Sequence, residues 1–243
     1  MKALERRFCL FVIALVAQWI EQLRPKEKIQ VRFLVRAQKY MTQKAKPILF
    51  CDFDGVLCHD RFWSNLPERH LNQVKDILLG GEPSLIDEWM RGKYSAEQVN
   101  TIVSKEIGLP YEELWEMFVQ NCRTMSVSMP VLELLSDLRK DYVVILTTGN
   151  MDSLARFTIP SLGLDKYFDL IVNSYYEGML KTDNGGETFI KYLNRYNAEI
   201  SESIVIDDSN RVCKVFRELG GVALRVTPEA DVLFHLKGIN RGI

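Results

Sequence analysis

The sequence predicts an α/β fold: a Rossmann-like parallel sheet with an α-helical cap domain inserted after its first strand. Short runs rich in β-branched residues alternate with segments of helical periodicity, the pattern of strand–helix–strand crossovers in a parallel sheet. The runs are continuously apolar, as strands buried on both faces require. Residues 59–128 interrupt this alternation, because they have helical periodicity and no strong strand signal.

Five strands are expected in chain order, each a short run that is mainly apolar. They are Pro47–Phe53, Tyr142–Leu146, Asp169–Asn173, Ser203–Ile206 and Val222–Val226. The helices expected between the later strands are Val131–Lys140, Ser153–Leu162, Gly186–Tyr196 and Arg211–Leu219. Pro130 suits the start of the first of these helices, and Gly163 suits the end of the second.

The interrupting stretch is expected to hold four further helices. They are Pro67–Leu79, Pro83–Met90, Ser95–Ile107 and Pro110–Asn121. Ser95 and Gln98 have the spacing of a capping box. We therefore divide the chain into an α/β core of residues 47–58 and 129–240 and a helical cap of residues 59–128, seated over the carboxyl end of the first strand.

The overall composition is that of an ordinary globular protein. Lys and Arg number 31 against 32 Asp and Glu, so the formal net charge is -1 and gives no electrostatic reason to expect a nucleic-acid partner. Hydrophobic residues make up 47%, which excludes disorder of the whole chain. The 5 cysteines are scattered, which argues against a disulfide framework or zinc site and favours a reducing, cytoplasmic compartment.

Residues 1–40 differ from the rest of the chain. Phe8–Ile20 is an apolar run, but it is shorter than the roughly 20 residues needed to span a bilayer. Ala17–Gln22 and Val31–Phe33 can be encoded by the D-arm and T-arm sequences of a transfer RNA gene, so residues 1–40 resemble a spurious translation of a tRNA gene. We expect the native chain to start at Met41, without a membrane partner. A membrane anchor and a genuine extension are the alternatives.

Polar residues gather at the carboxyl ends of the expected strands and in one following loop. They are Asp52 and Asp54, Thr147 and Thr148, Lys181, and Asp207 and Asp208. In open parallel sheets, ligands bind outside these strand ends. Four carboxylates this close stay ionised only if a cation offsets them, and an oxygen-rich ligand set suits Mg²⁺.

This combination of groups suits the chemistry of a phosphoryl group. Mg²⁺ together with a lysine and a hydroxyl can hold phosphate oxygens. One carboxylate can attack phosphorus to form an aspartyl-phosphate. A second carboxyl, two residues further on, can protonate the leaving oxygen and then activate water. Gly55 allows the sharp turn that lets backbone N–H groups face the phosphate.

The order of these motifs resembles the haloacid dehalogenase-like (HAD) hydrolase superfamily, in its phosphatase branch with a helical cap after the first motif. The motifs are Asp52–Leu57 (DFDGVL), Thr147, Lys181 and Asp207–Ser209. The resemblance extends over residues 47–227. It implies a Mg²⁺-dependent phosphatase that hydrolyses a small phosphorylated metabolite through an aspartyl-phosphate intermediate.

The resemblance also implies a role for each site residue. Asp52 would be the nucleophile and a metal ligand, and Asp54 the general acid and base, with its backbone carbonyl on the metal. Thr147, Thr148 and Lys181 would bind the phosphate of the substrate, while Asp207 and Asp208 would complete the metal site. Thr148 suits a helix N-cap equally well.

The sequence departs from the family pattern at two positions. Thr182, rather than the frequent proline, follows Lys181, and Val212 stands where many relatives carry Asp or Asn. Asp54 argues against dehalogenase chemistry, because the dehalogenating relatives lack an acidic residue there. A phosphomutase on the same scaffold and a non-catalytic HAD-like binding module are the alternative functions. The identity of the substrate and the oligomeric state stay open.

Overall fold

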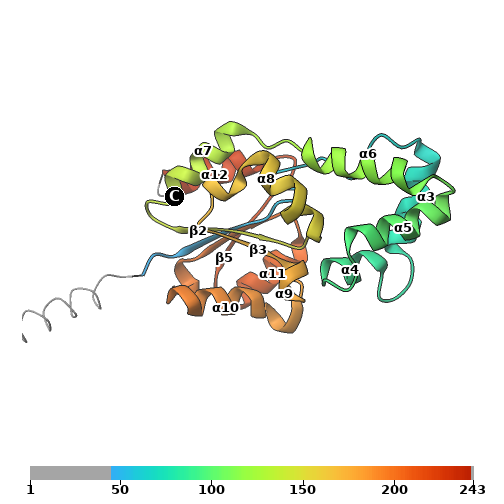
Figure 1. The fold of residues 1–243 in the computed structure, drawn as a ribbon. Helices are drawn as coiled ribbons and strands as arrows, with labels where there is room; N and C mark the ends of the chain where they lie inside the picture. Colours follow the sequence, from blue (N-terminus) through green and yellow to red (C-terminus); the bar gives the residue numbers. More distant parts are fainter. Residues whose placement is uncertain (1–44, 242–243) are drawn as a thin grey trace, which may run out of the picture. The chain divides into compact units, whose positions relative to one another are not determined.

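The computed structural model describes residues 45–241, so the segment that resembles a tRNA gene lies outside the described residues. The sheet formed by these residues has five parallel strands in the order β3-β2-β1-β4-β5. Its strands are β1 (Ile48–Cys51), β2 (Val143–Thr148), β3 (Leu170–Asn173), β4 (Ile204–Asp207) and β5 (Val222–Arg225). The five expected strands and the predicted α/β fold class are confirmed, and Figure 1 shows the arrangement of the sheet and its helices.

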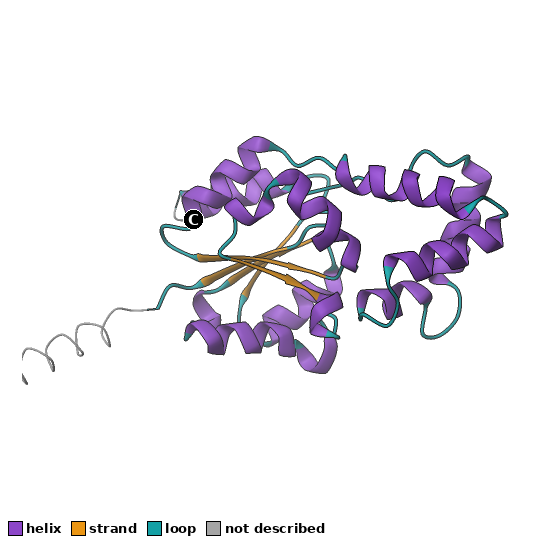
Figure 2. Cartoon of the chain, viewed as in Figure 1, coloured by secondary structure: helices purple, strands orange, loops and turns teal. Residues whose placement is uncertain are grey.

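Helices cover both faces of the sheet (Figure 2). One face carries α7 (Met129–Leu138), α8 (Ile159–Leu162) and α12 (Val232–Asn240), and the other carries α10 (Glu187–Tyr196) and α11 (Asn210–Glu218). Successive strand residues point to opposite faces. In β1, Leu49 and Cys51 therefore join one hydrophobic cluster while Ile48 and Phe50 join the other.

The connections between strands and helices contain several short elements. They are the π-helical turn η1 (Leu154–Thr158), α9 (Ser174–Glu177), and the 3₁₀ turns η2 (Leu164–Lys166), η3 (Asp183–Gly185) and η4 (Ile200–Glu202). The helix expected at Ser153–Leu162 is present as one continuous helical stretch, in which the π-helical turn η1 is followed by α8. Pro160 lies in the second part and has no N–H to continue the α-helical bonding pattern.

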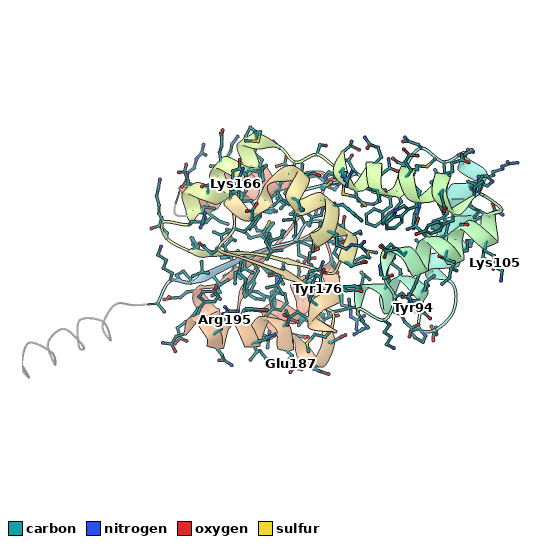
Figure 3. The ribbon with its side chains drawn as sticks, viewed as in Figure 1. Tyr94, Lys105, Lys166, Tyr176, Glu187 and Arg195 are labelled. Carbon is teal, nitrogen blue, oxygen red and sulfur yellow. The ribbon has the colours of Figure 1, made fainter. Side chains whose placement is uncertain are left out.

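The helical insertion, residues 59–128, contains all four of its expected helices. They are α3 (Glu68–Leu79), α4 (Leu85–Met90), α5 (Ala96–Ile107) and α6 (Tyr111–Arg123). The capping box at Ser95 and Gln98 is present. Trp63, Trp89 and Phe118 are buried at the centre of a hydrophobic cluster that belongs largely to these helices. Figure 3 draws the side chains of both parts, with Tyr94 on the insertion and Arg195 on the α/β part.

Buried hydrogen bonds join the insertion to the α/β part. Asp152, which follows β2, accepts from Nε1 of Trp89 over 2.9 Å and from the backbone N–H of Ala96 over 3.2 Å. The Oγ of Ser174 donates to the carbonyl of Met90 over 2.7 Å. These bonds hold α4 and the start of α5 against the loops that follow β2 and β3.

Two charged contacts complete this attachment. Arg91 pairs with Asp183 in the loop after β3. Arg156 bridges Asp152 and Glu97, so the start of α5 is linked to the turn after β2.

Within residues 45–241, no helix has both the length and the apolar character needed to cross a membrane.

Candidate active site

The strand register brings three of the predicted site residues side by side. Cys51 of β1 pairs with Leu146 of β2 on one side and with Ile206 of β4 on the other. The residues that follow these three are Asp52 directly after β1, Thr147 on β2 and Asp207 on β4. Because side chains alternate along a strand, these three lie on the same face at the carboxyl edge of the sheet.

Lys181 lies between two of the predicted carboxylates. Its Nζ is 2.6 Å from Oδ2 of Asp52 and 2.5 Å from Oδ2 of Asp207, and all three side chains are buried. Burial alone would lower the pKa of Lys181, but the two carboxylates raise it above the ordinary value. The lysine is therefore a permanent cation in this site.

The remaining carboxylate oxygens are oriented by backbone donors. The N–H of Phe53 donates to Oδ1 of Asp52 over 2.8 Å, and the N–H of Ser209 donates to Oδ1 of Asp207 over 2.9 Å. Each of these carboxylates is thus fixed in orientation by a backbone N–H together with Lys181.

Asp52, Asp207 and Asp208 form an acidic cluster that could hold a metal ion. One carboxylate oxygen from each lies within 4.8 Å of the others. Gly55 has a φ of +73°, and a Cβ there would overlap the carboxylate of Asp208, so this close approach depends on glycine. Three carboxylates against one lysine leave excess negative charge, and carboxylate oxygens are ligands that Mg²⁺ prefers. The residues present therefore fit the predicted magnesium ion.

The side chain of Asp54 lies outside that acidic cluster. Its Oδ2 accepts a hydrogen bond from Nδ2 of Asn150 over 2.7 Å, and its Oδ1 is 3.8 Å from Nη1 of Arg61. Burial, reinforced by the charge of Asp52, raises the pKa of Asp54 to about 7. A substantial fraction is then protonated near neutral pH, which a carboxyl group that donates a proton requires. The metal contact predicted for the backbone carbonyl of Asp54 stays a prediction.

Thr147 and Thr148 end strand β2, and both hydroxyls are buried. The two residues are 2% and 1% exposed, and neither Oγ1 has a hydrogen-bond partner among the described residues. Buried hydroxyls are rarely left unpaired. Thr147 lies on the same face as Asp52 and Asp207 and is the one of the two placed to meet a ligand there, whereas Thr148, one residue further on, points to the opposite face. Thr148 is the last residue of β2, and its Oγ1 caps none of the described helices, so the N-cap interpretation is wrong.

Two cavities open beside these residues. The first, of about 240 Å³, is lined by Asp52, Lys181 and Arg211 among others. The second, of about 490 Å³, is lined by Asp54 and extends between α3 and α4. Met90 and Gly149 line both cavities, so the two spaces adjoin at these residues. Thr182 and Val212, the two departures from the family pattern, line the smaller cavity.

Sequence reasoning missed Asn150 and Arg61, whose side chains lie beside the carboxyl group of Asp54. Asn150 stands two positions after Thr148 in the loop that follows β2, so its place at a strand end was an available signal. Arg61 carried no such signal, because it lies in a charged segment after the first motif with no periodicity. Its proximity to Asp54 depends on how the insertion begins.

The comparisons with known proteins agree with this geometry. The sequence model of the family described as haloacid dehalogenase-like hydrolase matches residues 47–220. The chain belongs to this family. The match includes every predicted site residue, from Asp52 to Asp208, together with the whole helical insertion. A search of curated proteins gave no match for this HAD-like hydrolase.

Solved structures show the same fold. A HAD family enzyme from Bacteroides thetaiotaomicron, in complex with magnesium and inorganic phosphate, is 20% identical with a TM-score of 0.60, over 76% of this chain and 96% of that chain. A predicted HAD-like family hydrolase from Porphyromonas gingivalis is 20% identical with a TM-score of 0.60, over 81% and 98%. A 2-haloacid dehalogenase from Pseudomonas syringae pv. Tomato DC3000 is 16% identical with a TM-score of 0.58, over 82% and 100%. The fold is therefore common to enzymes of different chemistry.

Proposed function

We propose that this HAD-like hydrolase is a Mg²⁺-dependent phosphatase that hydrolyses a small phosphomonoester metabolite through an aspartyl-phosphate on Asp52. The observation that carries the proposal is the position of Lys181 between Asp52 and Asp207, with Asp208 beside them. A nucleophilic carboxylate, a fixed cation and a set of metal ligands therefore share one small space.

In the first step, a carboxylate oxygen of Asp52 attacks the phosphorus atom of the substrate. The bond between phosphorus and the ester oxygen breaks, and Asp54 gives its proton to that oxygen, so a neutral alcohol leaves. The raised pKa of Asp54, about 7, keeps this proton available near neutral pH. Asn150 supports the step by holding the carboxyl group in one orientation.

In the second step, a water molecule attacks the phosphorus atom of the aspartyl-phosphate. Asp54, now ionised, takes a proton from the water, while the bond between phosphorus and Asp52 breaks. Inorganic phosphate leaves, and Asp54 is again protonated for the next cycle.

The surrounding groups would bind the phosphate and the metal ion. Asp52, Asp207 and Asp208 would hold Mg²⁺, which when bound supplies positive charge to offset the carboxylates and the phosphate oxygens. Lys181 and the unpaired hydroxyl of Thr147 would contact the phosphate oxygens. The helical insertion would act as a cap that limits the access of water during the first step.

Dehalogenation is the competing chemistry, because a 2-haloacid dehalogenase shares the fold. Loss of a halide needs no proton on the leaving atom, whereas loss of an alcohol does. The protonatable Asp54, held by Asn150 at the edge of the larger cavity, favours the phosphatase.

The test is release of inorganic phosphate from p-nitrophenyl phosphate, with Mg²⁺ and after its removal by a chelator. We expect chelation to abolish activity and Asp52→Asn to lower kcat by about a thousandfold or more. Asp137→Asn, on the exposed side of α7, is the matched control and should keep full activity. Full activity in Asp52→Asn, or halide release from a 2-haloacid with no release of phosphate, would contradict the proposal.

A further inference from the structure

The larger cavity has a mainly apolar wall. Leu71, Val74 and Leu78 of α3 line it at helical spacing, so one face of this helix is turned toward the space. Ile86 of α4 and Met151 of the loop after β2 add to this wall. Its volume of about 490 Å³ is that of a small-molecule binding site.

The cavity is placed to receive the part of the substrate that leaves. Asp54, the proposed proton donor, lines it, while Asp52 lines the smaller cavity with Lys181. The two cavities share Met90 and Gly149. With phosphorus beside Asp52 and the ester oxygen beside Asp54, the rest of the alcohol must extend into the larger cavity.

The polar groups on this wall are few, and they are either already paired or exposed to solvent. Asp60 already accepts hydrogen bonds from the N–H and the Oγ of Ser126, at 2.7 Å and 3.0 Å. Arg61 is beside Asp54, and Lys75 is exposed to solvent. Hydroxyl groups placed against Leu71, Val74 and Leu78 would lose their water without gaining partners, which weakens binding.

We propose that the substrate is the phosphomonoester of an apolar alcohol, whose alkyl part fills the cavity between α3 and α4. This inference rests on the proposed function and narrows it, since it ranks alkyl phosphates above sugar phosphates and nucleotides. The specificity-determining residues would be Val74, Leu78 and Ile86, because they line the cavity and lie outside the site of phosphoryl transfer.

A chain-length series tests the inference. We would measure kcat/KM for methyl, butyl, hexyl and octyl phosphate, and for glycerol and glucose phosphate, all with Mg²⁺. We expect kcat/KM to rise about fourfold per methylene until the cavity is filled. Glucose phosphate should be at least about tenfold poorer than hexyl phosphate, which has the same number of carbon atoms.

Substitutions within α3 make the test specific to the cavity. Leu78→Asn should lower the ratio of kcat/KM for octyl and methyl phosphate about tenfold, since it places an amide in the apolar wall. Ile77→Asn is the matched control: the neighbouring side chain is partly buried but does not line the cavity, so the ratio should stay unchanged. Val74→Phe should move the optimum to a shorter chain by filling space.

The outcomes separate this inference from the proposed function. The proposal of an apolar substrate would be overturned by a kcat/KM that does not change with chain length, or by a preference for glucose phosphate. An octyl-to-methyl ratio of kcat/KM that is unchanged in both Leu78→Asn and Val74→Phe would also overturn it. In each case the protein would still be a phosphatase. Absence of phosphate release from every ester, p-nitrophenyl phosphate included, would overturn the proposed function itself.

Discussion

Asn150 donates a hydrogen bond from its Nδ2 to Oδ2 of Asp54 across 2.7 Å, and this bond is the only side-chain hydrogen bond to that carboxyl group found among residues 45–241. Asn150 is itself held on both sides. Its Oδ1 accepts from the N–H of Met151, and its own N–H donates to Oγ of Ser174. The loop after β2 therefore orients the residue proposed to protonate the leaving oxygen.

Asn150→Ala should lower kcat for an alkyl phosphate by about tenfold, because Asp54 loses its fixed orientation. The effect on p-nitrophenyl phosphate should be much smaller, since the nitrophenolate ion leaves without a proton. Steady-state kinetics with the two esters measure this difference.

Asn173→Ala is the control for this experiment. Asn173 is also a buried amide that bonds to the same loop, through the carbonyl of Met151, but it does not contact Asp54. Asn173→Ala should change kcat for the alkyl phosphate and for p-nitrophenyl phosphate by the same factor. Equal losses on the two esters in Asn150→Ala would mean that Asn150 only supports the loop.

Gly55→Ala should abolish most of the activity and raise the Mg²⁺ concentration needed for half-maximal rate, because its Cβ would displace Asp208. Gly108 has the same φ of +73° at the end of α5 but open space around it. Gly108→Ala should therefore show only the conformational cost, about 1 kcal/mol, with activity unchanged. Magnesium titrations of both variants make the comparison, and unchanged magnesium dependence in Gly55→Ala would refute the role of the close approach.

Trp89→Phe should lower the free energy of unfolding by about 2 kcal/mol, because it removes the indole donor to the buried carboxylate of Asp152. Trp63→Phe is the matched control in the same cluster, since its indole donates to the neutral amide of Asn100 over 3.0 Å. Its expected cost is about 1 kcal/mol. Urea unfolding measures both, and a larger loss in Trp63→Phe would contradict the stronger contribution of Asp152.

Glu97→Gln should lower the free energy of unfolding at pH 7 by only about 0.5 kcal/mol, because the Glu97–Arg156 ion pair is exposed to solvent. Hydrogen bonding to Arg156 lowers the pKa of Glu97 to about 2. The pKa of Glu97 is lower in the folded protein than in the unfolded chain. The ion pair therefore stabilises the fold above the unfolded pKa of about 4.3, and this stabilisation is lost as the pH falls toward 2. Urea unfolding measures the free energy of unfolding of Glu97→Gln and of the parent protein, and the difference between them should be smaller at pH 3 than at pH 7.

The fold was largely predictable because its signals are local. Each strand is a short apolar run, and the helices of the insertion carry their own periodicity and caps, as at Ser95 and Gln98. Two features were missed. They are the π-helical turn within the helix after β2 and the helix α12 near the end of the described chain.

The candidate site was predictable where its residues follow strands and, for Lys181, where a family motif marks the residue. Parallel pairing carries Asp52, Thr147 and Asp207 to one edge without any knowledge of loops. Asn150 and Arg61 reach Asp54 through loop geometry, and the apolar cavity depends on how α3 and α4 are placed beside that loop. Such arrangements arise from contacts between distant segments, which periodicity in a single sequence does not encode.

The most direct test of the central claim is to trap the phosphorylated enzyme during turnover. The reaction with p-nitrophenyl phosphate and Mg²⁺ would be stopped rapidly and treated with borohydride, which reduces an acyl phosphate to an alcohol, and the peptides would be analysed by mass spectrometry. We expect homoserine in place of Asp52, at no other carboxylate, and only when Mg²⁺ is present. An unmodified Asp52 in enzyme that is releasing phosphate, or a modified Asp54 in its place, would show that Asp52 is not the nucleophile.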